Sequence, residues 1–208
     1  MNPNWAEENL RTIRTLMERS ALYRRALAPI MLLAGILGVA ATATGLVFHL
    51  DSSAAFEVLW LGTAAAAVAG AFLIARRQAL KDKEAFWSPP TRRVTQAALP
   101  PLLAGLCISL CFVLVGDMEA ASVLVVFWVL CYGCALHAAG FFMPRGIKWL
   151  GWIFITGACI LAFVISAWQP DFENFEDSAY WLMGFFFGLL HLAYGAYLFL
   201  TEKGKNAA

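Results

Sequence analysis

Charge is scarce in this sequence, and it is missing altogether from long stretches of the chain. Only 14% of the 208 residues are charged, whereas 61% are hydrophobic. A soluble domain usually has about a quarter of its residues charged and about half apolar. The net charge of +1 also gives no electrostatic basis for binding nucleic acid. The composition therefore excludes an ordinary soluble domain and favours a membrane protein.

The motifs of common enzymes are absent as well. The sequence has no Gly-rich phosphate-binding loop, and its apolar stretches contain neither a Ser–His–Asp set nor paired carboxylates. Glu57 is the only acidic residue within an apolar stretch, and we expect it near the outer surface, where it can reach water. Pro100 and Pro101 are expected in the first turn of a span, where a missing N–H costs little. A non-enzymatic protein is therefore favoured over an enzyme.

Six stretches are long and apolar enough to cross a membrane as helices. At roughly 1.5 Å per residue, about 20 residues cover a hydrocarbon core of roughly 30 Å. Helices are expected because a helix satisfies its own backbone hydrogen bonds without water. We predict an all-α, polytopic membrane protein, a helical bundle of six transmembrane helices arranged in three hairpins. The predicted spans are 26–50, 54–75, 97–115, 120–143, 147–167 and 178–200.

The basic residues are confined to one side of these spans. All 15 Lys and Arg residues fall before the first span, between spans two and three, between spans four and five, or after the last span. The other three loops contain no Lys or Arg and carry acidic residues instead. The positive-inside rule makes the basic side cytoplasmic. We therefore predict cytoplasmic N- and C-termini, in the cytoplasmic (inner) membrane of a bacterium.

Short soluble ends flank the predicted transmembrane domain. That domain covers residues 26–200, and residues 201–208 form a short cytoplasmic tail. Residues 1–25 are expected to form an amphipathic cytoplasmic helix, because Ile13 and Met17 belong to an apolar stripe with helical spacing. Its basic residues can contact anionic lipid, the ends of the other helices or a partner protein. These residues are Arg11, Arg14, Arg19, Arg24 and Arg25.

Cysteines gather near the middle of the predicted spans. Residues 131–140 read CYGCALHAAG, and on a helix Cys131, Cys134 and His137 are each displaced by about 60°. One metal ion could bind neighbours in this series but hardly all three. An apolar position also disfavours the thiolate that redox chemistry needs. Helix packing is therefore favoured, with a metal or redox site as the alternative. The cysteines concerned are Cys107, Cys111, Cys131, Cys134 and Cys159.

Two histidines form the most informative candidate site. His137 and His191 lie on glycine-rich faces of the fourth and sixth predicted spans. Polar groups within a membrane usually face the interior of the bundle. A neutral imidazole needs one donor and one acceptor there, and Tyr132 or Tyr194 could provide a partner. We expect a hydrogen bond between helices, with proton or ligand handling as the alternative.

Three functional classes remain open at this point. The favoured one is a non-enzymatic membrane protein that binds or regulates a partner through its N-terminal helix and the 76–96 loop. Its expected contacts are the lipid bilayer and a cytoplasmic protein or a second copy of the chain. The second is a small-solute or proton-linked transporter or channel with His137 and His191 in its interior. The third is a redox protein in which these histidines ligate haem b. No other cofactor and no metal are predicted.

Overall fold

All regular elements of the structure are helices. The computed structural model describes residues 26–50, 52–83, 85–115, 121–168 and 175–206, and no strand occurs in these ranges. The predicted all-α class is therefore confirmed, whereas the expected helix over 1–25 lies outside the described residues. The elements are the first helix (Ala26–Val47), α2 (Ser53–Lys81), α3 (Pro89–Val115), α4 (Ala121–Ala139), α5 (Arg145–Trp168), α6 (Phe175–Met183), the π-helix η2 (Gly184–Leu189) and α7 (Leu190–Asn206).

Five helical stretches are long and apolar enough to cross a membrane. They are Ala26–Val47, Ser53–Lys81, Pro89–Phe112, Arg145–Ala167 and Ser178–Thr201. The last of these runs without a break through α6, η2 and α7. The apolar part of α4, Val123–Ala139, is shorter than the others. The structure thus supports an integral, multi-pass membrane protein.

The predicted end of the fourth span is wrong by four residues. The sequence placed it at residue 143, whereas α4 ends at Ala139. The N–H of Gly140 still bonds to the Leu136 carbonyl oxygen at 2.8 Å, and a turn follows before α5 starts at Arg145. Pro144 lacks the N–H that a continuing helix would need. The 19 residues of α4 cover about 28 Å, close to the thickness of a hydrocarbon core.

The segment between α2 and α3 is much shorter than the expected 76–96 loop. α2 continues to Lys81, and α3 begins at Pro89 after Ser88, whose carbonyl oxygen accepts the N–H of Arg92 at 3.0 Å. Pro100 and Pro101 therefore lie inside α3, and their expected place in a first turn is wrong. The helix instead starts with another pair of prolines, which suit a first turn because their missing N–H groups are unpaired there anyway.

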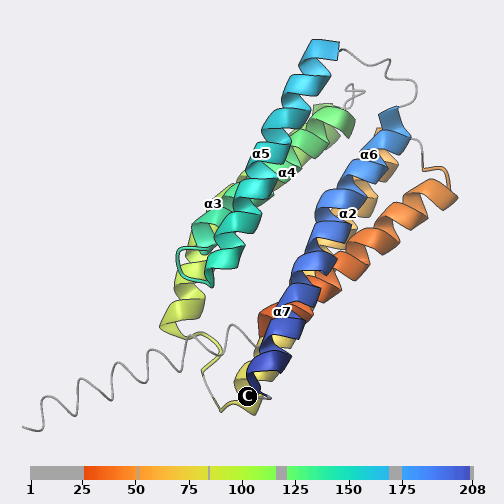
Figure 1. The fold of residues 1–208 in the computed structure, drawn as a ribbon. Coiled ribbons are helices and arrows are strands. Elements are labelled where there is room, and N and C mark those ends of the chain that lie inside the picture. Colours follow the sequence, from red (N-terminus) through yellow and green to blue (C-terminus); the bar gives the residue numbers. More distant parts are fainter. Residues whose placement is uncertain (1–25, 51, 84, 116–120, 169–174, 207–208) are drawn as a thin grey trace, which may run out of the picture.

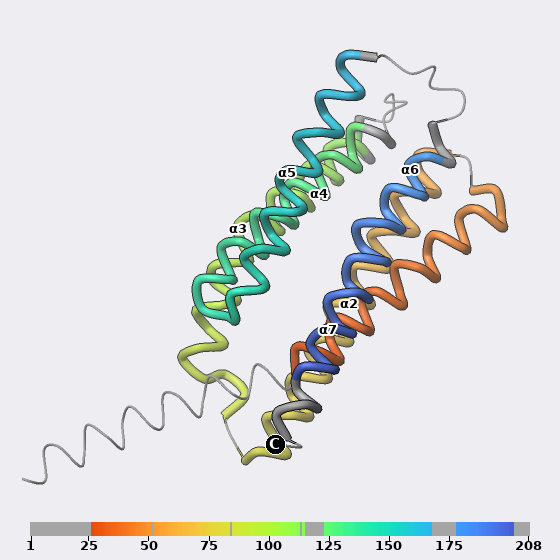
Figure 2. Tube along the Cα trace, in the orientation of Figure 1, coloured from red at the N-terminus to blue at the C-terminus, as the bar shows by residue number. Residues whose placement is uncertain are grey.

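The helices pack in two groups, which Figure 1 shows side by side. The central unit consists of α3, α4 and α5, with α4 in contact with both neighbours. The terminal unit consists of the first helix, α2, α6, η2 and α7. Successive helices reverse direction, so that the start of the first helix and the end of α7 lie at the same end of the molecule (Figure 2). Packing therefore pairs the sixth apolar stretch with the first helix, rather than with α5.

Glycines allow the first helix to lie directly against η2 and α7. A Cβ atom added to Gly38 would lie 2.5 Å from the carbonyl oxygen of Phe187, and one added to Gly35 would lie 2.7 Å from the Leu192 nitrogen. On the opposite helix, a Cβ on Gly188 would lie 2.9 Å from the Val39 side chain. Small residues on both helices let their backbones approach closely, as is common in membrane bundles. This contact fixes the rotation of η2 and α7.

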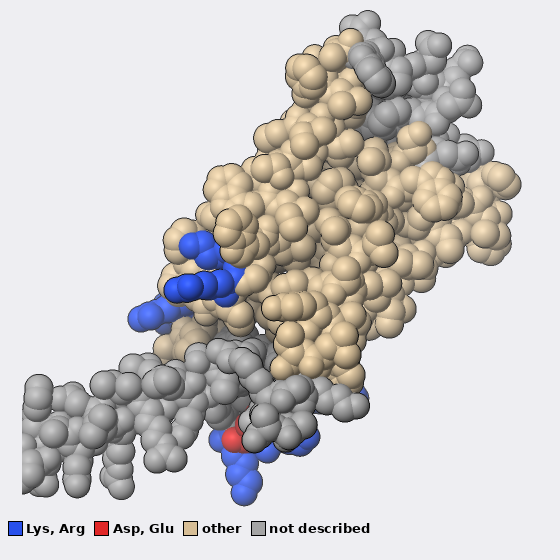
Figure 3. All heavy atoms as spheres, viewed as in Figure 1, with Lys and Arg blue, Asp and Glu red and all other residues tan. Residues whose placement is uncertain are grey.

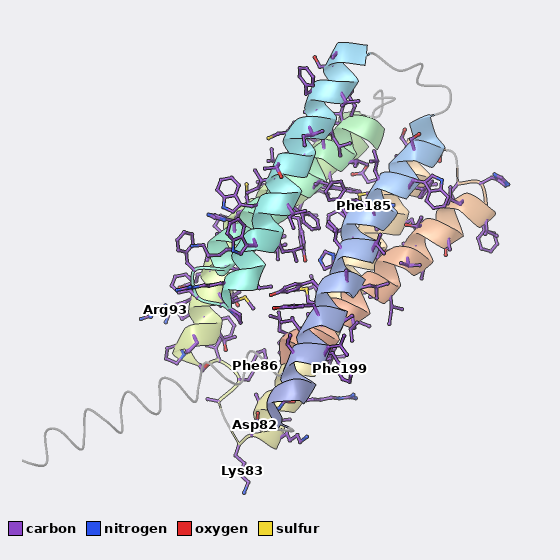
Figure 4. All side chains as sticks on the ribbon, in the orientation of Figure 1. Asp82, Lys83, Phe86, Arg93, Phe185 and Phe199 are labelled. Carbon is purple, nitrogen blue, oxygen red and sulfur yellow. The ribbon has the colours of Figure 1, made fainter. Side chains whose placement is uncertain are left out.

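Aromatic side chains fill the space between the two units. Phe56 from α2 stacks on Trp128 from α4, with ring centres 6.0 Å apart, and meets Tyr180 from α6 at 5.0 Å. Phe154 from α5 packs against Phe187 from η2 at 5.5 Å. Figure 4 shows side chains from both units in this space. The units therefore meet across a layer of rings that surrounds the buried polar groups described below.

Candidate functional site

A hydrogen bond between Tyr132 and His191 connects the two units. The hydroxyl of Tyr132, on α4, lies 2.7 Å from Nε2 of His191, near the start of α7. The other ring nitrogen, Nδ1, lies 3.1 Å from the carbonyl oxygen of Phe186. Because a carbonyl only accepts, Nδ1 carries the proton, and Nε2 accepts the hydrogen bond that Tyr132 donates. A neutral His191 thus uses both of its ring nitrogens within the protein.

The π-helix η2 provides the second partner of His191. The N–H of Leu190 bonds to the carbonyl oxygen of Phe185, five residues earlier. In an α-helix this N–H would bond to Phe186 instead. The Phe186 carbonyl oxygen therefore does not accept the N–H of Leu190, as it would in an α-helix. It accepts the imidazole N–H of His191 instead. Sequence analysis did not predict this irregularity, although Gly184 and Gly188 lie within it.

Aromatic rings enclose the imidazole of His191 on several sides. Only 1% of its surface is exposed. The ring of Phe187 is stacked at 6.1 Å between centres, while Phe154 presents its ring at a steep angle at 5.6 Å. Burial among rings strengthens the two hydrogen bonds, because no water competes for them. The arrangement serves as a fixed link between the central and terminal units.

His137 lies in a different environment from His191. Its ring packs against Phe141 at 5.4 Å and Trp152 at 5.0 Å, at the crossing of α4 and α5. A Cβ on Gly151 would lie 2.6 Å from the His137 backbone nitrogen, so the two helices are in close contact here. Its Nδ1 atom is buried and has no hydrogen-bond partner in the part of the chain that the structure describes. The structure therefore does not bring the two predicted histidines into one site.

Tyr194, the other tyrosine predicted as a partner, marks a second contact between the units. A Cβ on Gly146, at the start of α5, would lie 2.5 Å from the Tyr194 hydroxyl oxygen. The Tyr194 ring is stacked with that of Tyr197 at 6.3 Å. Tyr194 thus packs beside α5, and it is Tyr132 that bonds to His191.

The two histidines do not fit a haem-binding site. An axial histidine must offer a nitrogen lone pair to the iron. In His191 that lone pair accepts the hydrogen bond from Tyr132, and the opposite nitrogen is held by Phe186. His137 packs on rings of α4 and α5. The residues of the structure therefore disagree with the haem alternative.

The cysteines are free and spread over several surfaces. Cys107, Cys111 and Cys159 are exposed, whereas Cys131 and Cys134 are half-buried. A Cβ added to Gly105 would lie 3.4 Å from Cβ of Cys131, which places that cysteine at the contact of α3 and α4. Among the described residues, no group of three or more His, Cys, Asp or Glu side chains could hold a metal ion.

Sequence analysis missed a second group of buried polar atoms, on α2. Glu57 was expected to reach water, but only 5% of its surface is exposed, and its Oε1 atom has no hydrogen-bond partner among the described residues. Trp60 is 4% exposed, and its indole nitrogen also lacks a partner. The signal in the sequence was the isolated acid itself, three residues before a tryptophan.

The described Lys and Arg side chains gather at one end of the molecule (Figure 3). They come from the end of α2, the following loop and the first turns of α3 and α5, and Figure 4 labels Lys83 and Arg93 among them. The N-terminal arginines Arg11, Arg14, Arg19, Arg24 and Arg25 lie outside the described residues. No family model, curated protein or solved structure matches the chain.

Proposed function

We propose that the chain is a non-enzymatic, six-span protein of a bacterial inner membrane that binds a partner protein through its cytoplasmic face. In this proposal α4 crosses the membrane as the fourth of six spans, in addition to the five longer helices, and both termini are cytoplasmic. The partition of all 15 Lys and Arg residues supports this orientation. The N-terminal helix would add to the same face.

The observation that carries the proposal is an exposed tryptophan beside the basic residues. Trp87 lies between α2 and α3 and is 60% exposed. Its ring lies 6.5 Å from that of Phe86, which in turn packs on Phe72 of α2 at 4.9 Å. Lys83 and Arg92 nearby in the chain are exposed as well. Tryptophan and arginine are enriched among the residues that dominate binding at protein interfaces. An acidic partner surface with an apolar pocket would fit this loop.

The transporter alternative is less well supported by the same geometry. His191 was its principal residue, but both of its ring nitrogens already have partners inside the protein. His137 lies at a different helix crossing. A proton or solute that used His191 would first have to break the link to Tyr132. Lipid remains the expected neighbour of the exposed apolar faces of α2 and α3.

Reporter fusions test the proposed topology. Fusions after Leu50, Val115 and Trp168 should report the outside of the membrane. Fusions after Arg77, Arg145 and Lys205 should report the cytoplasm. The reason is the asymmetry of basic residues, which sets orientation during insertion. A reversed pattern, or one with five spans, would contradict the proposal.

Copurification after mild extraction tests the partner. Crosslinked native protein should yield a defined companion that is lost with Trp87→Ala, because truncating a central tryptophan usually costs about 2 kcal/mol or more at an interface. Trp181→Ala is the matched control, since Trp181 is 66% exposed but lies on α6, at the end of the molecule opposite to the basic residues. If both variants, or neither, lose the companion, Trp87 is not part of an interface.

A further inference from the structure

Glu57 and Trp60 on α2 each keep one buried polar atom without a hydrogen-bond partner among the described residues. Glu57 is the fifth residue of α2, and Trp60 follows three positions later, so both project from the same face of the helix. The Oε1 atom and the indole nitrogen are both buried without a hydrogen-bond partner. Leaving such a group unpartnered in an apolar interior is unfavourable, and more so for a charged one. Because both atoms lie on one face of α2, we consider them together as a candidate position for a ligand.

The two atoms specify what that ligand must offer. A carboxylate only accepts hydrogen bonds when it is charged, and an indole N–H only donates. The ligand must therefore provide a donor to Glu57 and an acceptor to Trp60. A water molecule could make both bonds, but it would not compensate a negative charge, and an uncompensated carboxylate in an apolar environment takes up a proton. A positively charged donor compensates this charge.

The surrounding side chains favour an organic cation. Phe56, next to Glu57, packs at 6.3 Å from the Trp60 ring and at 6.0 Å from the Trp128 ring. Aromatic faces attract ammonium groups and can replace part of their water. A divalent metal is disfavoured, because the described residues offer no group of three His, Cys, Asp or Glu ligands.

We propose that Glu57 and Trp60 bind a primary ammonium group that has an oxygen atom close by, as in ethanolamine. The ammonium donates to Oε1 of Glu57, and the ligand oxygen accepts the Trp60 N–H. A quaternary ammonium such as choline fits less well, because it has no N–H for the carboxylate. The ligand enters at the end of the bundle opposite to the basic residues, since α2 begins at Ser53 and its basic residues are at its other end. Free ethanolamine compounds and phosphatidylethanolamine headgroups share this chemistry.

The test is thermal unfolding of the full chain in phosphatidylcholine nanodiscs. Ethanolamine should raise the unfolding temperature in a saturable way, by roughly 5–10 °C at a hundredfold excess over its dissociation constant. Choline and sodium chloride at equal ionic strength should give clearly smaller shifts. In nanodiscs that contain phosphatidylethanolamine, a rise in the unfolding temperature without added ethanolamine identifies the lipid as the source. No rise there identifies the free amine.

Three variants make the result specific. Glu57→Gln should remove the response to ethanolamine, and Trp60→Phe should weaken it at least about tenfold, as expected for the loss of one buried hydrogen bond. Asp82→Asn is the control, because it removes a carboxylate at the basic end of α2 and should leave the response unchanged. If Glu57→Gln does not fold, Glu57→Asp should still lower the affinity. Equal shifts with ethanolamine and choline, no saturable shift, or a full response in Glu57→Gln would each overturn the proposal.

Discussion

Two pairs of buried polar groups lie among the same layer of rings, and only one of them is complete. Tyr132 donates a hydrogen bond to Nε2 of His191, and the carbonyl oxygen of Phe186 accepts a hydrogen bond from Nδ1–H. Glu57 and Trp60 are equally buried, yet each keeps one polar atom without a partner. Burial alone therefore does not show whether a polar group has its hydrogen-bond partners within the protein. The two pairs differ in whether the described residues provide the hydrogen-bond partners.

Replacing His191 should have the largest effect on stability. His191→Leu leaves the Tyr132 hydroxyl and the Phe186 carbonyl oxygen buried without their partner, so we expect a loss of about 2–4 kcal/mol in the free energy of unfolding. Equilibrium unfolding in mixed micelles measures it. His137→Leu is the control and should cost less than about 1 kcal/mol, because Nδ1 of His137 has no hydrogen bond to lose. Equal losses in the two variants would contradict a linking role for His191.

Tyr132→Phe should have a smaller effect, because it removes the donor and keeps the ring. We expect a loss of about 1–2 kcal/mol, since Nε2 of His191 is left without its donor. The double variant with His191→Leu should lose less than the sum of the two single losses. Additive losses would contradict the hydrogen bond at 2.7 Å between the two side chains.

The class of the protein and the presence of its helices could be predicted from the sequence, because long uncharged stretches leave few alternatives. The ends of α4 and the extension of α2 to Lys81 could not be predicted in this way. Membrane helices continue into the interface without a change in hydrophobicity that marks their ends, and turns such as that before Pro144 depend on packing. The sequence also did not show that α3 starts as early as Pro89. Pro100 was therefore expected in a first turn, although it lies inside the helix.

Partners within the candidate site were harder to predict than its residues. His191, Tyr132, His137 and Tyr194 were all named, but which of them meet depends on the grouping of helices into units. That grouping results from backbone contacts such as Gly38 with Phe187, which sequence spacing alone does not pair. The π-helix added a register shift that no residue pattern indicated. Glu57 was recognised as unusual, but its burial depends on its neighbours in space.

Replacing Glu57 should change stability in the opposite direction from His191. Glu57→Met keeps the side-chain length and removes the unpartnered carboxyl group, so the ligand-free protein should gain about 1 kcal/mol. Equilibrium unfolding in phosphatidylcholine without added amine measures this gain. A loss of stability would mean that the carboxyl group has a partner in the membrane-bound protein, and the contrast with His191 would disappear.

The smallest effect is expected for Trp60, and a second tryptophan makes it interpretable. Trp60→Phe removes an indole N–H that has no partner among the described residues, so the stability of the ligand-free protein should fall by no more than about 0.5 kcal/mol beyond the loss of ring volume. Trp128→Phe removes the same atoms, but the Trp128 N–H donates to Oγ of Ser109 at 2.8 Å. Ser109 is fully buried, and its hydroxyl would lose that donor. Trp128→Phe should therefore cost about 1 kcal/mol more than Trp60→Phe, measured by unfolding under identical conditions. Equal costs would mean that the indole N–H of Trp60 is as well satisfied as that of Trp128 in the ligand-free protein, which would remove one of the two unpartnered groups that define the proposed ammonium site.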